Sequence, residues 1–275
     1  MNVDVAVIPA AGRGTRMKAA TRVVPKALLP VVDRPALQWV LEEAVASGVA
    51  ELIVVVSPGV DDLIFSHFEG MGGLDRLGEF QETRLTWVVQ DRPLGLGHAV
   101  LQAREAVAGR PFHCLLGDNI MPVGVPCLAP LAAASDGRSV MALRKMTPTE
   151  TGAYGIAALG DWLDDDVVEI VGAVEKPGPA AAPSDLGFLG RYLFTAEVFD
   201  LLDDAEPGYG GEIQLTDAIQ RLAAAGRCLG SVVGSAPMDV GNPASYLEAM
   251  TMLGLHHPDT AERYRAFIES IVEGG

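Results

Sequence analysis

The stretch VDVAVIPAAGRGTRM, residues 3–17, decides the fold class of this chain. It starts with an apolar run from Val3 to Pro9, whose length and β-branched side chains are typical of a buried strand. The run leads directly into Ala10, Ala11 and a glycine-containing turn. Because the ligands of open parallel sheets collect beyond the carboxyl ends of the strands, this turn is expected to lie at a binding site.

The rest of the first 120 residues repeats this alternation of apolar runs and amphipathic stretches. The pattern predicts an α/β fold with a doubly wound, mostly parallel, Rossmann-like mixed sheet flanked by helices. One helix is expected between the first two strands, with Asp33 as its N-cap, Pro35 in its first turn and Gly48 as its stop. Another is expected from Leu96 to Ala108. The further strands are predicted at Glu51 to Ser57, Arg84 to Val89 and Phe112 to Leu116.

The second half of the chain has a looser pattern with glycine- and proline-containing turns, which predicts a mixed arrangement. Two helices are expected to close the chain, one capped by Asn242-Pro243 and the other running from Asp259 to about Val272. The acidic cluster Asp161, Asp164, Asp165 and Asp166 is interpreted as a solvated turn. Strands are predicted at Ser139 to Leu143, Val167 to Glu175 and Gly187 to Phe194.

The charge balance limits the classes of partner. With 36 acidic and 20 basic residues, the formal net charge is −16, which argues against broad electrostatic binding to nucleic acid or to an anionic membrane. An anionic ligand must therefore be held locally, by basic residues in a glycine-rich loop or by a cation that carboxylates carry.

The cellular location follows from three weaker signals. The three cysteines form no CxxC pair, the first residues lack the basic region of a signal peptide, and no apolar run reaches the roughly 18 residues of a membrane span. A soluble, cytoplasmic protein is expected.

The turn Gly12-Arg13-Gly14-Thr15-Arg16-Met17 differs from both common nucleotide-binding patterns. A dinucleotide fingerprint needs a small residue where Met17 stands, and the turn is not GxxxxGK[ST] either. Its glycines let backbone N–H groups approach phosphate oxygens, and its arginines add forked donors that suit a triphosphate. Lys26, which follows Pro25, can return a further cation to the same phosphates. The alternative is a purely structural turn with exposed arginines.

Several segments resemble the sugar-1-phosphate nucleotidylyltransferases, and most closely the bacterial UTP-glucose-1-phosphate uridylyltransferases. The resemblance begins with AAGRGTRM at residues 10–17 and PKALLPVVDRPALQWV at residues 25–40, and it covers roughly residues 1–250. The segments that follow in the family's order are VVQDRPLGLGHAV (88–100), LLGDN (115–119), YGI (154–156), VEKP (174–177), GRY (190–192), GEIQLTDAI (211–219) and DVGNP (239–243).

The resemblance implies a domain organisation. A nucleotidylyltransferase domain would span residues 1–255, with a nucleotide-binding part at about 1–120 and a smaller sugar-phosphate-binding part at about 121–245. A C-terminal helix would occupy residues 256–275. Members of this family commonly assemble, so a homo-oligomer, either a dimer or a tetramer, is expected.

The resemblance also implies a nucleotide site. Gln90 and Gly95, together with Gly97, would line the base pocket, and one amide can both donate to and accept from a pyrimidine edge. His98 is interpreted as a structural histidine at the start of a helix, because phosphoryl transfer needs no protein nucleophile here. The residues that would hold the triphosphate are Ala10, Ala11, Gly12, Gly14, Thr15, Arg16 and Lys26.

Two carboxylates and a second group of residues complete the implied site. Asp118 and Asp239 would hold Mg²⁺, although each is also interpretable as a helix cap. The residues implied to bind the sugar phosphate are Gly155, Glu175, Lys176 and Arg191. Those implied to drive catalysis are Arg16, Lys26, Asp118 and Lys176.

The implied reaction is Mg²⁺-dependent transfer of a nucleotidyl group to a sugar 1-phosphate, with UTP and glucose 1-phosphate as the expected substrates. Ala27 stands where the uridylyl pattern has glutamate, and Asn119 also departs from that pattern, so dTTP, a purine triphosphate or a cyclitol phosphate remain alternatives. Two alternatives of other classes are a non-catalytic nucleotide-sugar-binding regulator and a nicotinamide-dependent reductase. Met17 argues against the reductase.

Overall fold

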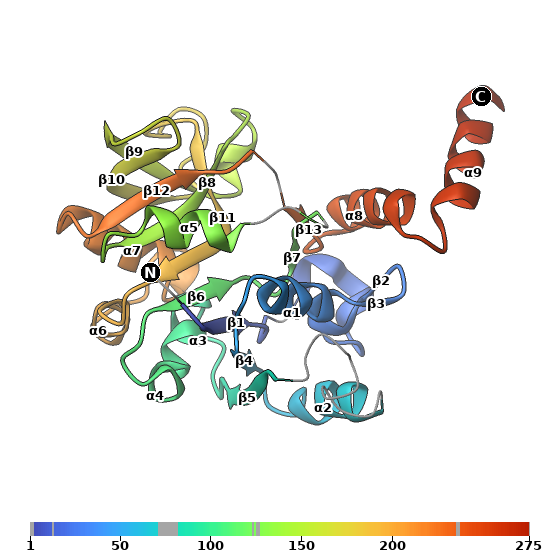
Figure 1. The fold of residues 1–275 in the computed structure, drawn as a ribbon, viewed down its shortest axis with the longest axis horizontal. Helices are drawn as coiled ribbons and strands as arrows, with labels where there is room; N and C mark the ends of the chain where they lie inside the picture. Colours follow the sequence, from blue (N-terminus) through green and yellow to red (C-terminus); the bar gives the residue numbers. More distant parts are fainter. Residues whose placement is uncertain are drawn as a thin grey trace.

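The computed structural model describes residues 3–12, 14–70, 82–122, 124, 127–234 and 237–274. A nine-stranded mixed sheet forms the centre of the molecule and helices flank it, as the sequence predicts (Figure 1). In spatial order the strands are β5 (Arg84–Val89), β4 (Glu51–Val56), β1 (Val5–Pro9), β6 (Phe112–Leu115), β11 (Leu186–Phe194), β8 (Ser139–Lys145), β12 (Cys228–Val232), β10 (Val167–Glu175) and β9 (Gly155–Trp162).

Parallel pairing joins the four strands β5, β4, β1 and β6, so their carboxyl ends lie along one edge of the sheet. β8 and β12 are also parallel, whereas β11, β10 and β9 run antiparallel to their neighbours. Residues 10–12 and 116–118 follow β1 and β6, two neighbouring strands, and therefore meet at that edge.

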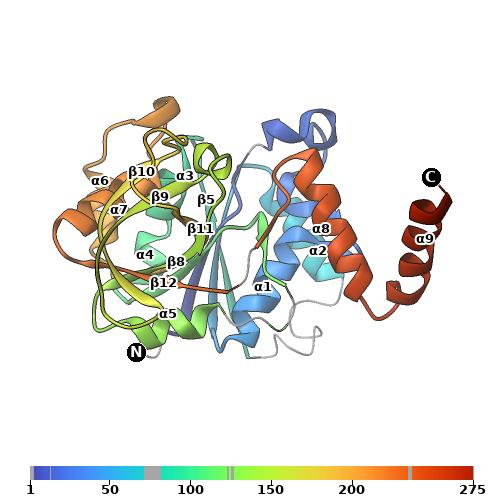
Figure 2. The same cartoon turned by 90° about the horizontal axis from the view of Figure 1, so that it is seen from above.

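Helices cover both faces of the sheet (Figure 2). Alternate side chains of β1 enter different cores, because Val5 and Val7 pack in one hydrophobic cluster while Ala6 and Ile8 pack in another. The first cluster includes helices α3, α6 and α7, and the second includes α1 and α2. The helices are α1 (Ala36–Ala46), α2 (Asp61–Gly70), α3 (Leu96–Gln102), α4 (Arg104–Val107), α5 (Leu128–Ala134), α6 (Val198–Asp203) and α7 (Leu215–Ala224).

Among the described residues, two short ribbons and four 3₁₀ turns complete the body. β7 (Asn119–Ile120) pairs antiparallel with β13 (Met238–Asp239), which sets Asn119 opposite Asp239 although 120 residues separate them. The other elements are the ribbon β2 (Pro30–Val31) with β3 (Arg34–Pro35), and η1 (Thr15–Thr21), η2 (Lys26–Leu28), η5 (Glu150–Gly152) and η6 (Tyr209–Gly211).

Two helices close the chain, as the sequence predicts. Asn242 caps α8 (Pro243–His256) by accepting hydrogen bonds from the N–H groups of Ala244 and Ser245, which are 3.1 and 3.2 Å away. α9 (Ala261–Gly274) projects away from the body (Figure 1). In the described part of the chain, no helix has both the length and the apolar character required to cross a membrane.

Two expected helix boundaries are wrong. Pro35, not Asp33, is the N-cap of α1, because Val31 and Arg34 pair as a ribbon and leave Asp33 in the turn between them. The helix predicted from Leu96 to Ala108 breaks at Ala103 into α3 and α4.

Strands β9 and β12 were absent from the prediction, since their glycines and alanines weaken the signal of a strand.

Asp164, Asp165 and Asp166 form the expected solvated turn, whereas Asp161 lies near the end of strand β9. Asp161, Asp164, Asp165 and Asp166 are all exposed. Asp164 Oδ1 accepts hydrogen bonds from the N–H groups of Asp166 and Val167 at 2.9 and 2.7 Å, so this carboxylate organises the turn between β9 and β10.

Candidate active site

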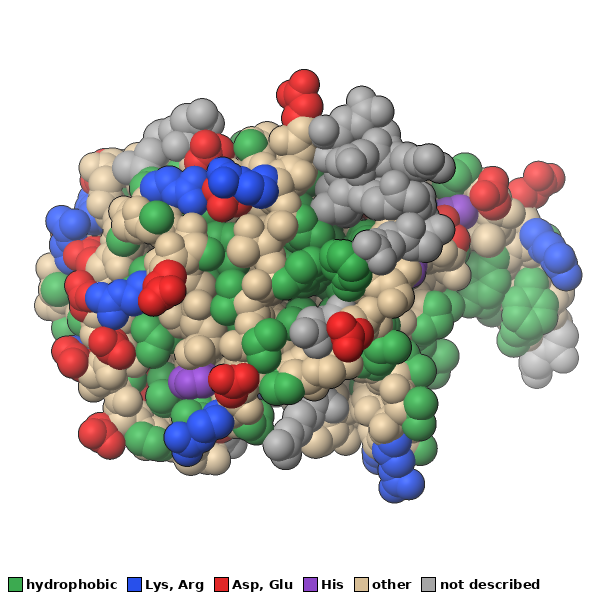
Figure 3. All heavy atoms as spheres, turned by 90° about the horizontal axis from the view of Figure 1, so that it is seen from below, with side chains coloured by type: hydrophobic (Ala, Val, Ile, Leu, Met, Phe, Trp, Pro, Cys, Tyr) green, Lys and Arg blue, Asp and Glu red, His purple; other side chains and the backbone are tan. Residues whose placement is uncertain are grey.

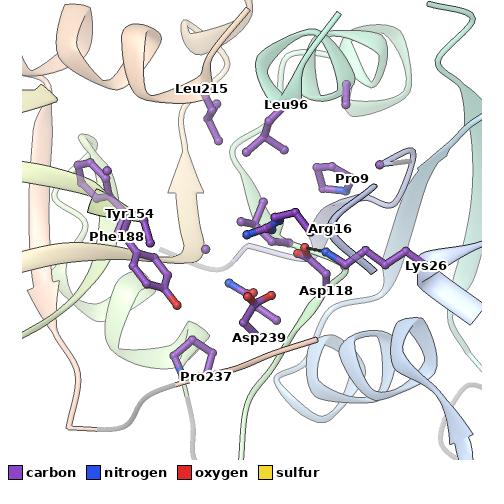
Figure 4. Close-up of a pocket in the computed structure, with 18 of the residues that line it drawn as sticks. Pro9, Arg16, Lys26, Leu96, Asp118, Tyr154, Phe188, Leu215, Pro237 and Asp239 are labelled. Atoms are coloured by element: carbon purple, nitrogen blue, oxygen red, sulfur yellow. Dashed lines mark hydrogen bonds and ion pairs between the residues drawn. The ribbon is translucent and has the colours of Figure 1, made fainter. Parts of the chain in front are cut away.

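A cavity of about 1210 Å³ lies at the carboxyl edge of the parallel strands. Residues from both halves of the chain line it, from the turn after β1 to the β13 ribbon. Figure 4 shows Arg16, Lys26 and Asp118 close together, with Tyr154 and Phe188 across the cavity from Lys26. The expected site residues that line the cavity are Ala10, Ala11, Gly12, Gly14, Thr15, Arg16, Lys26, Gln90, Gly95, Asp118, Gly155, Glu175, Lys176 and Asp239.

Hydrogen bonds to strand β4 and to Ser57 fix the position of the turn after β1. The Ala10 N–H donates to Val55 O at 2.7 Å, and Ser57 Oγ donates to Ala11 O at 2.7 Å, which anchors the turn to the neighbouring strand β4. Gly14 has a φ of +61°, where glycine is favoured, and a Cβ there would lie 3.0 Å from Lys26 Cβ. The turn therefore brings its backbone close to Lys26. Arg13 lies outside the described residues.

Four charged groups converge at the floor of the cavity. Lys26 forms an ion pair with Asp118, and the side chain of Lys26 is only 10% exposed. Gly241 supplies the space, because a Cβ there would stand 2.8 Å from both Arg16 Nη2 and Lys26 Nζ and 2.6 Å from Asp239 Oδ1. Two cations and two carboxylates thus share one small region.

The pKa values of the two carboxylates are shifted in opposite directions. Burial alone would raise the pKa of Asp118, but the cations of Lys26 and Arg16 outweigh it and hold that pKa below its usual value of 3.8. Burial and the nearby Asp118 carboxylate raise the pKa of Asp239 above the same value, with Lys26 opposing them. An added cation between these carboxylates would favour their charged forms.

The backbone holds the two carboxylates together. The Val240 N–H donates to Asp118 O at 2.9 Å, which extends the pairing of β7 with β13. The Gly241 N–H donates to Asp239 Oδ1 at 2.7 Å and orients that carboxylate. Among the described residues, no group of three or more His, Cys, Asp and Glu side chains could hold a metal ion. Two hard oxygen donors nevertheless suit Mg²⁺, which keeps water and phosphate oxygens as its other ligands.

Gln90 closes one end of the cavity. The residue is 5% exposed and follows β5 directly, so it lies at the same sheet edge as the turn after β1. Its Nε2 atom lies 3.1 Å from Gly95 O and 2.9 Å from His98 Nδ1. Gly97 is not part of the lining, because its N–H donates to Ile213 O at 2.9 Å and a Cβ there would meet that same oxygen. The expectation that Gly97 lines the base pocket is wrong.

Glu175 and Lys176 lie at the other end, where β10 ends. Glu175 Oε2 accepts a hydrogen bond from Thr216 Oγ1 at 2.6 Å, and Glu175 Oε1 lies 2.7 Å from Lys176 Nζ. Lys176 has a φ of +47°, an uncommon conformation for a residue with a side chain. A Cβ on Gly155 would come within 3.2 Å of Glu175 Oε2 and 2.9 Å of the Phe188 ring, so glycine keeps this part of the cavity open.

Arg191 lies outside the cavity, contrary to the expectation from the sequence. Its side chain is fully buried and does not line the cavity. Its Nε and Nη2 atoms donate to the two carboxylate oxygens of Glu43 at 2.8 and 2.5 Å, and Nη2 also donates to Asn119 O at 2.6 Å. Arg191 points toward Glu43 on α1, and its hydrogen bond to Asn119 O supports the chain just after Asp118.

Sequence reasoning missed a group of polar side chains near Glu175. Arg144 forms an ion pair with Glu150 and lies 5.6 Å from the centre of the Tyr154 ring, and all three residues line the cavity. No spacing or motif marks Arg144 or Glu150 in the sequence. Tyr154 lies in the YGI segment and Thr216 in the GEIQLTDAI segment, so these two segments could have identified both residues as part of the site.

The glycine-containing turn, its cations and the paired carboxylates at the edge of a mixed α/β sheet are typical of proteins that handle nucleotide phosphates. Residues 5–254 match the Nucleotidyl transferase family, and the chain belongs to that family.

Curated relatives match over almost the whole length. A Streptococcus pneumoniae protein named UTP–glucose-1-phosphate uridylyltransferase is 35% identical over 281 residues, which cover 96% of this chain and 94% of the relative. A Bacillus subtilis protein of the same activity name is 34% identical over 284 residues, covering 98% and 95%.

Solved structures are similar throughout the fold. A UDP-glucose pyrophosphorylase complexed with UDP-glucose has a TM-score of 0.83 and 30% identity, covering 90% of this chain and 97% of the other. A UTP-bound enzyme of this type from Acinetobacter baumannii has a TM-score of 0.81 and 30% identity, covering 97% and 99%.

Proposed function

We propose that this protein transfers the uridylyl group of UTP to glucose 1-phosphate, releasing pyrophosphate and giving UDP-glucose. The observation that carries this proposal is the convergence of Arg16, Lys26, Asp118 and Asp239 between a Gln90 end and a Glu175 end of one cavity. The names of the Streptococcus and Bacillus relatives, and the UTP and UDP-glucose in the structural neighbours, support the choice of substrates.

Each end of the cavity takes one substrate in this proposal. The part at about residues 1–120 holds the nucleotide, with the turn after β1 on the triphosphate and Gln90 on the base. The part at about residues 121–245 holds the sugar phosphate, with Glu175 accepting hydrogen bonds from sugar hydroxyls and Lys176 on the phosphate. The side chain of Lys176 remains one third exposed, which leaves it accessible to a phosphate.

The sugar-phosphate oxygen attacks the α-phosphorus of UTP in line, and pyrophosphate leaves toward the Gly12 turn. No side chain forms a bond to phosphorus. The protein positions two anions that repel each other in solution, and Arg16, Lys26 and Lys176 neutralise the charge that develops on the phosphate oxygens. This arrangement lets a protein with a net charge of −16 bind polyanions.

Asp118 and Asp239 would hold Mg²⁺. The donor set fits that ion, because both ligands are hard oxygens and because the Asp118 carboxylate raises the pKa of Asp239, an effect that a bound cation would oppose. When bound, Mg²⁺ would neutralise phosphate charge beside the Lys26 ammonium.

The test is a pyrophosphate-release assay with glucose 1-phosphate and UTP, dTTP, CTP, ATP or GTP, each with Mg²⁺ and with a chelator. We expect UTP to have the highest kcat/KM, dTTP to follow, and the chelator to stop turnover. Gln90→Ala should lower kcat/KM for UTP. A preference for ATP or GTP would overturn the uridylyl proposal, and UDP-glucose binding without turnover would favour the regulator.

We also propose that the protein is a cytoplasmic homo-oligomer. Its cysteines are free and buried, which suits a reducing compartment. Hydrophobic side chains are exposed on the projecting C-terminal helices (Figure 3), including Phe267, Ile271 and Val272 at 56%, 54% and 76% exposure. Light scattering should give the mass of a dimer or tetramer, and a monomer at micromolar concentration would contradict this.

A further inference from the structure

The carboxamide of Gln90 is held in one orientation by two acceptors. Its Nε2 atom has two hydrogens, and Gly95 O and His98 Nδ1 lie 3.1 and 2.9 Å from that atom. Gly95 O can only accept, so turning the amide over would place oxygen against oxygen. No donor among the described residues bonds to Gln90 Oε1. Gln90 lines the cavity, so its Oε1 atom remains available to accept a hydrogen bond from a ligand there.

His98 has to be neutral to act as the second acceptor. Burial, with a smaller contribution from the Arg92 cation, holds the pKa of His98 below its usual value of 6.5, so the ring is uncharged at neutral pH. With a lone pair on Nδ1, the ring proton is on Nε2, and the nearby Gln102 Nε2 donates instead to the His98 carbonyl oxygen at 3.3 Å. The contact between His98 and Gln90 therefore runs from α3 to the cavity and leaves Gln90 Oε1 facing the ligand side.

We propose that His98 is a positioning residue for base selection, which it performs by holding both Nε2 hydrogens of Gln90 away from the nucleotide. Only an acceptor then faces the base. This inference rests on the proposed function, since it requires a pyrimidine triphosphate at the Gln90 end of the cavity. It assigns to His98 a role beyond packing at the start of α3.

The consequence follows from the hydrogen-bonding edges of the pyrimidines. Uracil and thymine carry an N–H at ring position 3, which can donate to Gln90 Oε1. Cytosine has a lone pair at that position, so two acceptors would face each other and both would lose their contact with water. A freely rotating amide would present its NH₂ group to cytosine instead. The His98 contact therefore separates UTP and dTTP from CTP, and it does not separate UTP from dTTP.

The experiment compares kcat/KM for UTP, dTTP and CTP in the wild type, His98→Leu and His98→Asn. Leucine has no acceptor, whereas the Asn side-chain oxygen can still accept from Gln90. In His98→Leu we expect the preference for UTP over CTP to fall roughly tenfold to hundredfold, mainly through KM, with dTTP following UTP. His98→Asn should recover most of the preference.

The chain offers a matched control in His67 of α2. This histidine is also half-buried, and its Nε2 atom also contacts a glutamine, lying 3.2 Å from Gln38 Oε1, but neither residue lines the cavity. His67→Leu should leave the UTP-to-CTP ratio unchanged. A preference that survives in His98→Leu, or an equal loss of kcat for all three nucleotides, would overturn the inference.

Binding measurements guard against a folding defect. Calorimetric titration of UTP and CTP without sugar phosphate reports base selection independently of turnover, and thermal melting checks the fold. His98→Ala, which also lacks an acceptor but adds no volume, serves as the second variant. If the wild type prefers a purine nucleotide, the proposed function fails; if it prefers UTP and both acceptor-free variants keep that preference, only the role of His98 fails.

Discussion

Replacing Glu43 by leucine should destabilise the protein strongly, because it would leave a buried guanidinium without its counter-charge. The Arg191 side chain is 0% exposed and that of Glu43 is 12% exposed, and two hydrogen bonds of 2.8 and 2.5 Å join them. Breaking a buried pair by removing one partner costs about 3–5 kcal/mol, since the remaining charge stays desolvated. For domains of about 150–250 residues, each kcal/mol lost lowers the melting temperature by about 2–4 °C, so for this chain the melting temperature should fall by about 6–20 °C.

Urea unfolding and thermal melting measure this effect, and two further variants isolate its cause. Asp200→Leu breaks the exposed Arg104–Asp200 ion pair, whose side chains are 43% and 71% exposed, and should cost less than about 1 kcal/mol. The double variant Glu43→Leu/Arg191→Met removes both buried charges and should recover much of the lost stability. A Glu43→Leu variant within 1 kcal/mol of the wild type, or a double variant no more stable than the single one, would refute the reasoning.

Asp118→Asn should abolish Mg²⁺-dependent turnover, because it removes a charged metal ligand with little change in volume; full activity at ordinary Mg²⁺ concentrations would contradict this assignment. Lys176→Ala should raise KM for the sugar phosphate, lower kcat, or both, while calorimetry shows unchanged UTP binding; unaltered sugar-phosphate kinetics would make Lys176 a surface charge. A hydrogen bond from Arg144 holds the pKa of Glu150 at about 2, below its usual 4.5, so the stabilisation from this pair is complete above pH 4.5 and is lost as the pH falls toward 2. The stability difference between wild type and Glu150→Gln in urea should therefore shrink from about pH 6 to about pH 3, and a constant difference would count against it.

Local sequence patterns predicted the elements that depend on neighbouring residues. The apolar run of β1, the strand Arg84–Val89 and the Asn242 cap of α8 agree with the structure, because a run of β-branched residues and a capping side chain are features of residues close in the chain. Asp33 failed as a cap for a non-local reason, since the β2–β3 pairing withdraws it into a turn. The strand order of the antiparallel half of the sheet could not be predicted either, because contacts between distant segments determine which strands pair.

The candidate site likewise combines features that the sequence predicts with features that only the tertiary structure determines. The sequence by itself predicted many of the residues that the structure brings to one cavity, since the turn after β1, Lys26, Asp118 and Glu175 stand in recognisable segments that line it. Side-chain direction was left to the tertiary structure. A charged residue in a motif can face a ligand or form an ion pair in the core. The position of Glu43 on α1 decides that Arg191 forms a buried ion pair.

The tertiary structure alone also decided how distant groups act on one another. The pairing of β7 with β13 brings Asp239 beside Asp118, and it depends on backbone hydrogen bonds between segments 120 residues apart, which no local pattern encodes. The orientation of the Gln90 amide is set by Gly95 O and His98 Nδ1, which are near it in the chain but reach it only through the conformation of the loop between β5 and α3. The sequence specifies the donors and acceptors, whereas the packing of helices on the sheet decides which of them remain available to a ligand.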